Sequence, residues 1–408
     1  MSAFRSMTSF RNADVVVVGG GTVGAWTAAL LAENSTLEVV LLEARTLGDG
    51  ASSRAAGMVR AQGGTETAIR LGLRSQEFYS ESGERFPLDC GFVRQGYLMP
   101  CFTPGEVAQA HDRIALQQSL GLDVEWLSGD DIDSRATGLA PGSTLGASYA
   151  PGDGYLDAPR NVLAYTAALT ATGVDVRERC AFTGLRTSGG RVVGVNTSEG
   201  PIDTGRVVLT GGPQLAEVGA RAGGRIPAGG ARHQVVVTAP LPLDVHELPM
   251  VFDVTSGIYW RPGEAGGLLW GMSNPDESPG PAIDFDTAYF LTAQKRIEAL
   301  LPSVVGLGLR RSWAATIDYT PDHLPILGPL LTDDGPVQGT VVASAAGHGM
   351  MWGPAVAQVA AELTKFGECD WLDLTDLGLD RFDADGNSRL APEPISLPFP
   401  ETLEKISS

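Results

Sequence analysis

The chain opens with two hydrophobic patterns in close succession. Residues 15–18 are four consecutive valines, which is typical of a short strand buried on both faces. Residues 26–33 carry small and apolar side chains at helical spacing, and residues 37–42 form a second apolar run that ends at Glu43. This order predicts a strand, a helix and a second strand of a parallel sheet.

The same patterns continue through the rest of the chain. Helical spacing alternates with short runs that have strand periodicity, and glycine-rich turns such as Ser188-Gly189-Gly190 separate them. The helices predicted in this way cover residues 161–172, 290–301 and 354–365, and the strands cover 181–186, 191–197, 206–210, 234–239, 257–261, 267–272 and 341–343.

The turn between the first strand and the first helix reads Gly19-Gly20-Gly21-Thr22-Val23-Gly24, which fits GxGxxG. Gly19 allows the tight turn, Gly21 lets the backbone approach a pyrophosphate, and Gly24 lets the helix pack closely on the strand. Glu43 follows about 20 residues later, where a carboxylate accepts hydrogen bonds from ribose hydroxyls. The spacing predicts a dinucleotide site. Glu43 disfavours NADP, but it does not separate NAD from FAD.

Four later segments bear on that choice. They read LGDGASSRAAGMVR at 47–60, DGYLD at 153–157, TIDYTPDHLPILG at 316–328 and AGHGMMWGPAVAQVAAEL at 346–363. In this order they resemble the D-amino acid oxidase superfamily of FAD-dependent oxidoreductases, nearest to the group of glycine, sarcosine and dimethylglycine oxidases. The resemblance spans about residues 13 to 382.

The resemblance implies FAD as the cofactor. In the last segment, the residues after the glycine turn form a helix whose positive N-terminus would stabilise charge that develops on the reduced flavin. The residues expected to contact FAD are Gly19, Gly21, Thr22, Val23, Gly24, Glu43, Ala44, Arg45, Ser52, Ser53, Arg54, Ala56, Gly57, Met58, Ala181, Phe182, Gly211, Gly212, Gly347, His348, Gly349, Met350 and Met351.

The expected fold class is α/β, with an FAD-binding Rossmann-like domain of the glutathione-reductase type and a substrate domain built on a mostly antiparallel sheet. The FAD-binding domain is discontinuous and comprises residues 10–85, 150–225 and 318–382. Residues 86–149 and 226–317 form the substrate domain, and 383–408 are a C-terminal tail.

The chemistry implied is oxidation of the C–N bond of an amino acid or of a secondary or tertiary amine by hydride transfer to flavin N5. The product is an imine or its hydrolysis product. His233 and Tyr259 match the positions of a histidine and a tyrosine that lie at the substrate amine in dimethylglycine oxidases. Arg261, Arg60 and Arg311 are candidates for binding a substrate carboxylate through the guanidinium fork, and Arg261 ranks first.

Two other functions remain open at this stage. One is a flavin-dependent 2-hydroxy acid oxidoreductase in the same fold. The other is a non-catalytic FAD-binding subunit of a hetero-oligomeric amine dehydrogenase.

Departures from the related enzymes concern the flavin. Arg54 occupies the position of the histidine that attaches FAD in dimethylglycine oxidases, and RSWAATID at 311–318 lacks the cysteine that attaches it in sarcosine oxidases. We therefore expect non-covalent FAD. Leu269 and Met351 stand where sarcosine oxidases carry lysines, so the electron acceptor, oxygen or an electron carrier, stays open.

Composition and charge exclude several classes of binding partner. The formal net charge of −19 argues against nucleic acid and anionic membranes. The four cysteines are widely spaced, which disfavours disulfides and zinc, and DADGN at 383–387 lacks the later glutamate of a calcium loop, so we expect no metal. The chain is expected to be cytoplasmic, without a signal peptide or membrane helix, and to act on a small-molecule amine or amino acid. Association into a homo-oligomer stays open.

Overall fold

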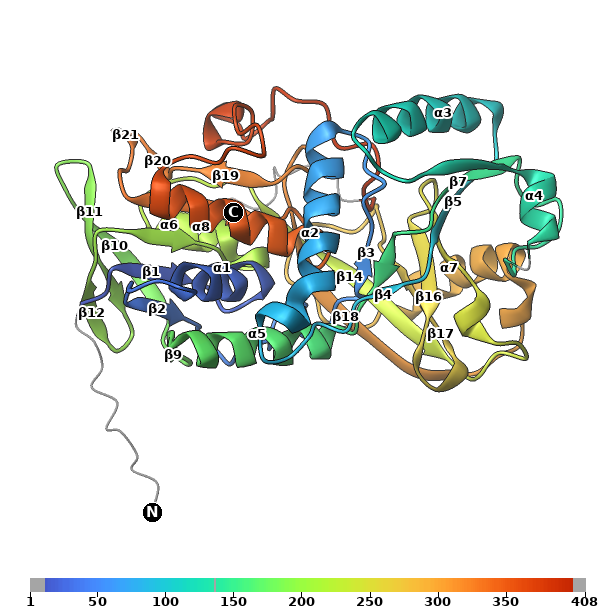
Figure 1. The fold of residues 1–408 in the computed structure, drawn as a ribbon, viewed down its shortest axis with the longest axis horizontal. Coiled ribbons are helices and arrows are strands. Elements are labelled where there is room, and N and C mark those ends of the chain that lie inside the picture. The colour runs from blue at the N-terminus through green and yellow to red at the C-terminus, as the bar shows by residue number, and fades with distance from the viewer. Residues whose placement is uncertain (1–11, 136, 399–408) are drawn as a thin grey trace, which may run out of the picture.

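The computed structural model describes residues 12–135 and 137–398. Residues 10 and 11 of the predicted FAD-binding domain and 399–408 of the tail lie outside the described residues. Figure 1 shows a sheet covered by helices at one end of the molecule and a second sheet at the other, with helix α2 (Glu66–Arg85) between them.

The first sheet has six strands in the order β19-β22-β13-β1-β2-β9. All neighbouring pairs are parallel except β19 and β22. The strand bounds are Val15–Val18 for β1, Val39–Leu42 for β2, Asp175–Arg177 for β9, Val207–Leu209 for β13, Ile326–Gly328 for β19 and Thr340–Ser344 for β22.

Both faces of this sheet are covered, which explains the run of four valines in β1. Val15 and Val17 pack against the helices α1 (Thr22–Ala32), α5 (Ala158–Thr172) and α8 (Gly353–Phe366). Val16 and Val18 face the opposite side. There they join side chains of the antiparallel strands β10 (Phe182–Ser188), β11 (Arg191–Thr197) and β12 (Gly200–Asp203).

The second sheet has eight strands in the order β18-β14-β17-β16-β15-β5-β7-β6, and only the pair β15 and β5 is parallel. The strand bounds are Tyr97–Cys101 for β5, Glu125–Ser128 for β6, Gly146–Ala150 for β7, Gly229–Thr238 for β14, Met250–Asp253 for β15, Ile258–Pro262 for β16, Leu268–Met272 for β17 and Leu309–Tyr319 for β18.

Alternation along these strands directs side chains to two different surroundings. Val236 and Trp260 pack under helix α7 (Thr287–Leu300), together with Phe290 of that helix. Val235 and Tyr259 face the other way, toward residues of the first half of the chain. Residues on the same face of the second sheet as Tyr259 therefore point toward the space between the two sheets.

The remaining elements complete the fold. They are α3 (Pro104–Ser119), α4 (Gly129–Ser134), α6 (Leu215–Arg221), β3 (Met58–Val59), β4 (Val93–Arg94), β8 (Gly154–Tyr155), β20 (Leu331–Thr332), β21 (Gly335–Pro336) and the 3-10 turns η1 (Ala51–Ser53), η2 (Gly212–Gln214), η3 (Val245–Glu247), η4 (Glu264–Gly266), η5 (Pro302–Val304) and η6 (Leu379–Arg381).

The α/β fold class is confirmed, with a mostly antiparallel second sheet. All strands of the first sheet lie within the three segments predicted for the FAD-binding domain, although the division into two domains stays a prediction. The predicted elements differ from the observed ones mainly at their ends: the strand predicted at 234–239 begins five residues earlier, at Gly229.

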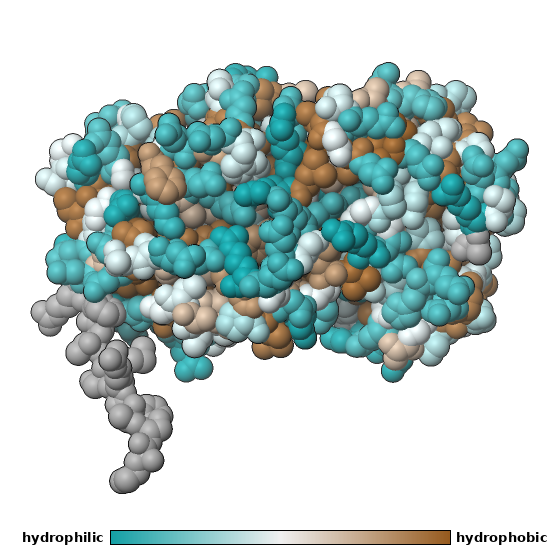
Figure 2. Space-filling model, viewed as in Figure 1, coloured by the Kyte–Doolittle hydropathy of each residue, from teal (hydrophilic) through white to brown (hydrophobic). Residues whose placement is uncertain are grey.

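Most residues on the face seen in Figure 2 are hydrophilic, in keeping with the acidic composition. Among the described residues, no helix has both the length and the hydropathy needed to cross a membrane.

Candidate functional site

A cavity of about 640 Å³ lies where the carboxyl ends of the parallel strands meet the second sheet. This edge of a parallel sheet is the usual location of nucleotide sites. The residues that line the cavity come from segments far apart in the sequence, within residues 18–24, 42–60, 210–218, 315–318 and 343–351. A volume of this order is within the range of ligand-binding pockets.

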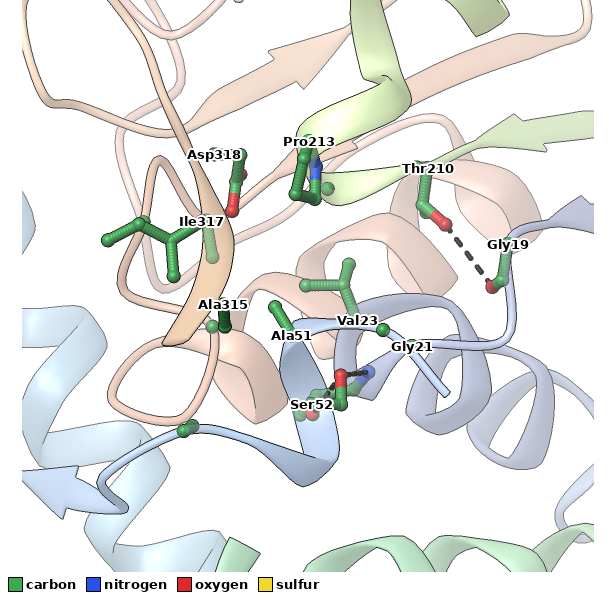
Figure 3. Close-up of a pocket in the computed structure, with 18 of the residues that line it drawn as sticks. Gly19, Gly21, Val23, Ala51, Ser52, Thr210, Pro213, Ala315, Ile317 and Asp318 are labelled. Atoms are coloured by element: carbon green, nitrogen blue, oxygen red, sulfur yellow. Dashed lines mark hydrogen bonds between the residues drawn. The ribbon is translucent and has the colours of Figure 1, made fainter. Parts of the chain in front are cut away.

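The first glycine turn has the geometry that its motif predicts. Gly19 has a φ of +98°, and a Cβ on Gly24 would lie 1.9 Å from the carbonyl oxygen of Gly19. The Thr210 hydroxyl holds this turn by donating to the carbonyl oxygens of Val18 and Gly19, at 2.5 and 3.3 Å. Figure 3 shows Gly19 and Thr210 at one end of the cavity.

Helix α1 begins directly after the turn and points its N-terminus at the cavity. Gly21 is its N-cap and provides no side-chain hydrogen bond, so the first peptide N–H groups depend on other partners. One of these groups, the Thr22 N–H, donates a hydrogen bond to the Ser52 hydroxyl oxygen at 2.9 Å, as Figure 3 shows. A helix N-terminus with glycine at its cap can hold a phosphate through its N–H groups and its dipole.

Glu43 lines the cavity at the end of β2. Its carboxylate accepts hydrogen bonds from the backbone N–H of Gly20 at 2.8 Å and of Arg45 at 2.7 Å. Because a carboxylate has about four acceptor positions, two remain for hydroxyl groups of a ribose. Ala181 and Phe182 also line the cavity.

The loop 50–58 forms one wall of the cavity and is held by three distant segments. The indole N–H of Trp313 donates to the carbonyl oxygen of Arg54 at 2.8 Å, and Arg261 Nε donates to that of Ala56 at 2.6 Å. The Leu156 N–H donates to the carbonyl oxygen of Gly57 at 2.9 Å. A Cβ on Gly57 would lie 1.9 Å from the Leu156 oxygen, so this position requires glycine.

The second glycine turn lies across the cavity, before helix α8. Its backbone is fixed by the Tyr79 hydroxyl, which donates to the carbonyl oxygen of Met350 at 2.8 Å. Burial, with nearby Arg60 and His323, lowers the pKa of His348 to about 3, so His348 is neutral at physiological pH. Its Nδ1 lies 2.9 Å from the carbonyl oxygen of Ala346 and therefore carries the proton, which leaves Nε2 as an acceptor.

These features fit a bound FAD. The glycine cradle and the uncapped helix suit the pyrophosphate, Glu43 suits the adenosine ribose, and the loop 50–58 and the second glycine turn enclose the remaining space. Of the residues expected to contact FAD, all except Ser53 line the cavity.

His233 and Tyr259 lie together on the cavity side of the second sheet. The Tyr259 hydroxyl and His233 Nε2 share a hydrogen bond, and the two rings are nearly parallel, with centroids 5.5 Å apart. His233 Nδ1 lies 2.7 Å from the Ser273 hydroxyl, so both ring nitrogens have partners. Either neutral tautomer of His233 satisfies both contacts.

Burial sets the charge state of this pair. It lowers the pKa of His233 to about 4, and it raises the pKa of Tyr259 well above the ordinary value of 10.0. Both side chains are therefore uncharged at neutral pH, and together they offer a hydroxyl group and an imidazole to a ligand.

Two residues that position this pair were not expected from the sequence. Ser273 follows β17 and holds the histidine. Gly271 lies opposite Tyr259 in the sheet, and a Cβ there would be 2.1 Å from the Tyr259 hydroxyl oxygen. Side chains alternate between the two faces of a strand, so the sequence GGLLWGMS at 266–273 places Gly271 and Ser273 on the same face as Leu269, which is the cavity side. Only the pairing of β16 with β17 shows that they lie next to Tyr259.

The three candidate arginines occupy different places. Arg60 is buried and lines the cavity. Arg261 lies outside it: its guanidinium donates to Ala56 and Pro262 carbonyl oxygens and stacks 4.6 Å from the Tyr155 ring centroid. Arg311 is largely exposed and pairs with Glu264 at 3.1 Å. The contacts thus favour Arg60 for the role first given to Arg261.

Asp318 is a further polar residue of the cavity that sequence analysis did not single out. It lies on β18 beside Ile317 and near Pro213 (Figure 3). The Ser344 hydroxyl donates to its carboxyl group at 3.0 Å, and burial raises the pKa of Asp318.

Comparison with known proteins gives consistent matches. A family model described as FAD dependent oxidoreductase (DAO) matches residues 14–363. The chain is 29% identical over 385 residues to 4-methylaminobutanoate oxidase (formaldehyde-forming) of Paenarthrobacter nicotinovorans, covering 92% of this chain and 46% of that protein. It is 29% identical over 368 residues to glycine oxidase of Geobacillus kaustophilus, covering 86% and 93%. The chain therefore spans less than half of the first relative.

The fold has close relatives among solved structures. The structure of L-proline dehydrogenase from P. horikoshii superposes with a TM-score of 0.81 at 26% identity, covering 88% of this chain and 95% of that one.

Proposed function

Because the chain belongs to the DAO family of FAD-dependent oxidoreductases, we propose that it oxidises the C–N bond of an amino acid or of a secondary or tertiary amine. The family confirms the predicted FAD cofactor and the oxidoreductase class. The observation that carries the proposed reaction is the uncharged His233–Tyr259 pair at the cavity.

Bound FAD would supply the acceptor for a hydride from the carbon next to nitrogen. Loss of that hydride leaves an iminium ion, which becomes an imine when an N–H proton is also lost. The amine must be neutral for this step. The buried surroundings favour the neutral form, because desolvation lowers the pKa of an amine.

The His233–Tyr259 pair orients the amine. With its proton donated to His233 Nε2, the Tyr259 oxygen keeps lone pairs that accept an N–H of the substrate. A histidine with a pKa of about 4 is a weak base near neutral pH. The pair therefore acts mainly by hydrogen bonding to the neutral amine.

Arg60 binds the carboxylate of an amino acid substrate. It donates to the carbonyl oxygens of Gln62 and Ile395, which accounts for two of its five N–H groups. Burial lowers the pKa of Arg60, but an arginine stays charged at neutral pH. The charge of a buried guanidinium in the cavity complements a carboxylate.

The flavin is held without a covalent bond. Arg54, at the position of the attaching histidine, donates from its guanidinium to the Gly50 carbonyl oxygen at 3.0 Å, within its own loop. The electron acceptor is oxygen or an electron carrier, and the apolar Leu269 and Met351 favour the carrier.

An anaerobic substrate panel tests the proposal. Each N-methyl amino acid is compared with its decarboxylated amine and with the matching 2-hydroxy acid, and bleaching of the flavin band is followed. Amines should bleach the flavin and hydroxy acids should not. Bleaching by the hydroxy acids alone would contradict the proposal and support the 2-hydroxy acid alternative.

The role of Arg60 is tested in the same assay. Arg60→Lys should raise the KM for carboxylate-bearing substrates about tenfold to a hundredfold, the loss expected for a charged hydrogen bond. The decarboxylated amines should be much less affected. Arg311→Lys makes the same change on the surface and serves as the control.

A further inference from the structure

The last described part of the chain returns to the cavity after passing the edge strand β19, where the Leu377 carbonyl oxygen accepts a hydrogen bond from the Leu327 N–H. Arg381 and Asp322 form a fully buried ion pair at 2.7 Å, and the Ser388 hydroxyl donates to the same carboxylate at 2.6 Å. These contacts fix the path of the chain after the family match has ended at residue 363. The segment was predicted to be a tail, but residues up to 398 pack against the body of the protein.

Glu393 anchors the segment beside the substrate end of the cavity. Its carboxyl group accepts hydrogen bonds from the Gly64 N–H and the Thr65 hydroxyl, each at 2.6 Å. Its own N–H donates to the carbonyl oxygen of Asp322 at 2.9 Å. The side chain is 1% exposed, so these contacts replace its hydration shell. These contacts tie the start of residues 394–397 to the turn before α2 and to Asp322.

Those residues contact the proposed catalytic groups. The Ile395 carbonyl oxygen accepts a hydrogen bond from Arg60, and the Ile395 side chain packs in one cluster with Tyr259 and Phe252. The Ser396 hydroxyl lies 2.6 Å from His323 Nδ1. Leu397 lines the cavity.

We propose that residues 393–397 place Leu397 in the wall of the substrate compartment and that Leu397 determines which apolar substituents a substrate can carry. This proposal rests on the proposed function for the identity of the ligand. Residues 393–397 lie beyond residue 363, where the match to the family model ends.

The surroundings of Leu397 indicate the class of substituent. Leu397 packs against the cluster that contains Tyr259 and, like Ile317, against Ala231 and Tyr319. Pro281, Ile283 and Phe252 line the same cavity, and Ile283 is 70% exposed. The carboxylate and amine of the substrate have polar partners in Arg60 and the His233–Tyr259 pair. The remainder of the substrate meets aliphatic and aromatic side chains, so we infer that it carries an apolar alkyl group.

Two variants of Leu397 change the wall in opposite directions. Leu397→Ala enlarges the compartment, and Leu397→Trp fills it. Leu390→Ala is the matched control, because Leu390 belongs to the same segment, is partly buried and lies outside the residues that line the cavity. All are purified as flavin-loaded enzymes, so that a change in folding appears as a change in bound FAD.

The first measurement is independent of any substrate. Acrylamide quenching of flavin fluorescence should increase in Leu397→Ala and decrease in Leu397→Trp, and it should be unchanged in Leu390→Ala. Quenching that is the same in all four proteins would overturn the assignment of Leu397 to the wall.

The second measurement tests the ligand. Acetate and hexanoate are titrated against the visible absorption band of the flavin. Leu397→Trp should weaken hexanoate binding about tenfold or more, the effect expected of overpacking, and should leave acetate nearly unchanged. An equal loss of affinity for acetate and for hexanoate would overturn the role of Leu397 in selecting substrates by size. If the unaltered protein binds neither carboxylate, the role of Arg60 in binding a carboxylate fails, and the quenching result alone decides the role of Leu397 in the wall.

Discussion

Replacing Tyr259 by phenylalanine removes one oxygen atom from the centre of the proposed site. The Tyr259 ring is buried, and its hydroxyl is the partner of His233 Nε2. The Ser273 hydroxyl still holds Nδ1, so the imidazole keeps its orientation but loses one hydrogen bond. The variant therefore tests the hydroxyl itself with little change in shape.

The size of the effect follows from burial. A buried nitrogen left without a partner costs about 1–3 kcal/mol of folding free energy. Loss of a hydrogen bond of this strength to the reacting amine corresponds to about a tenfold to hundredfold slower reduction of the flavin. Both effects should appear together, because one hydroxyl serves both the histidine and the substrate.

The assay is anaerobic stopped-flow reduction of the flavin by the best amine of the panel, with chemical unfolding measured in parallel. Tyr165→Phe is the control: Tyr165 is equally buried, lies outside the cavity, and its hydroxyl has no hydrogen-bond partner among the described residues. It should keep the reduction rate and the stability. A Tyr259→Phe enzyme that reduces its flavin as fast as the control would refute the assigned role.

Three further predictions follow from the same geometry. Gly24→Ala places a Cβ 1.9 Å from a backbone carbonyl oxygen, so the purified protein should contain much less FAD, whereas Gly308→Ala, with open space at that position, should keep it. Gly271→Ala places a Cβ 2.1 Å from the Tyr259 hydroxyl and should slow flavin reduction while FAD content is retained; an unchanged rate would contradict the packing of that ring. Since burial lowers the pKa of His233 from 6.5 to about 4, its contribution to stability is complete above pH 6.5 and is lost as the pH falls toward 4. His233→Asn should therefore flatten the pH dependence of the unfolding free energy in that range, and curves that stay parallel would show that His233 is not responsible.

The parallel sheet and its first glycine turn could be predicted because their signals are local. A strand buried on both faces must be apolar along its whole length, and the turn needs glycine at Gly19 and Gly24 for steric reasons within six residues. The resemblance then supplied the position of His233 and Tyr259. The structure brings these two residues together, from strands that are separated in the sheet by β17.

Other parts of the site depend on contacts between distant segments. Arg261 closely follows Tyr259 on the predicted strand, which suggested a place in the cavity, but its guanidinium donates to a carbonyl group 205 residues away in the sequence. Leu397 lies in a segment rich in Pro, Asp and Gly with no periodic pattern, so no local signal pointed to the cavity. Asp318 sat within a family motif, yet its burial depends on the pairing of β18 with β14 and on Ser344.

The central claim is that three distant segments of this chain enclose one FAD without a covalent bond. The most direct test is the absorption spectrum of the purified protein, followed by denaturation and separation of the polypeptide from the supernatant. The account predicts a yellow protein with one FAD per chain, all of it released into the supernatant. A colourless protein that takes up no added FAD, or flavin that stays with the denatured polypeptide, would contradict it.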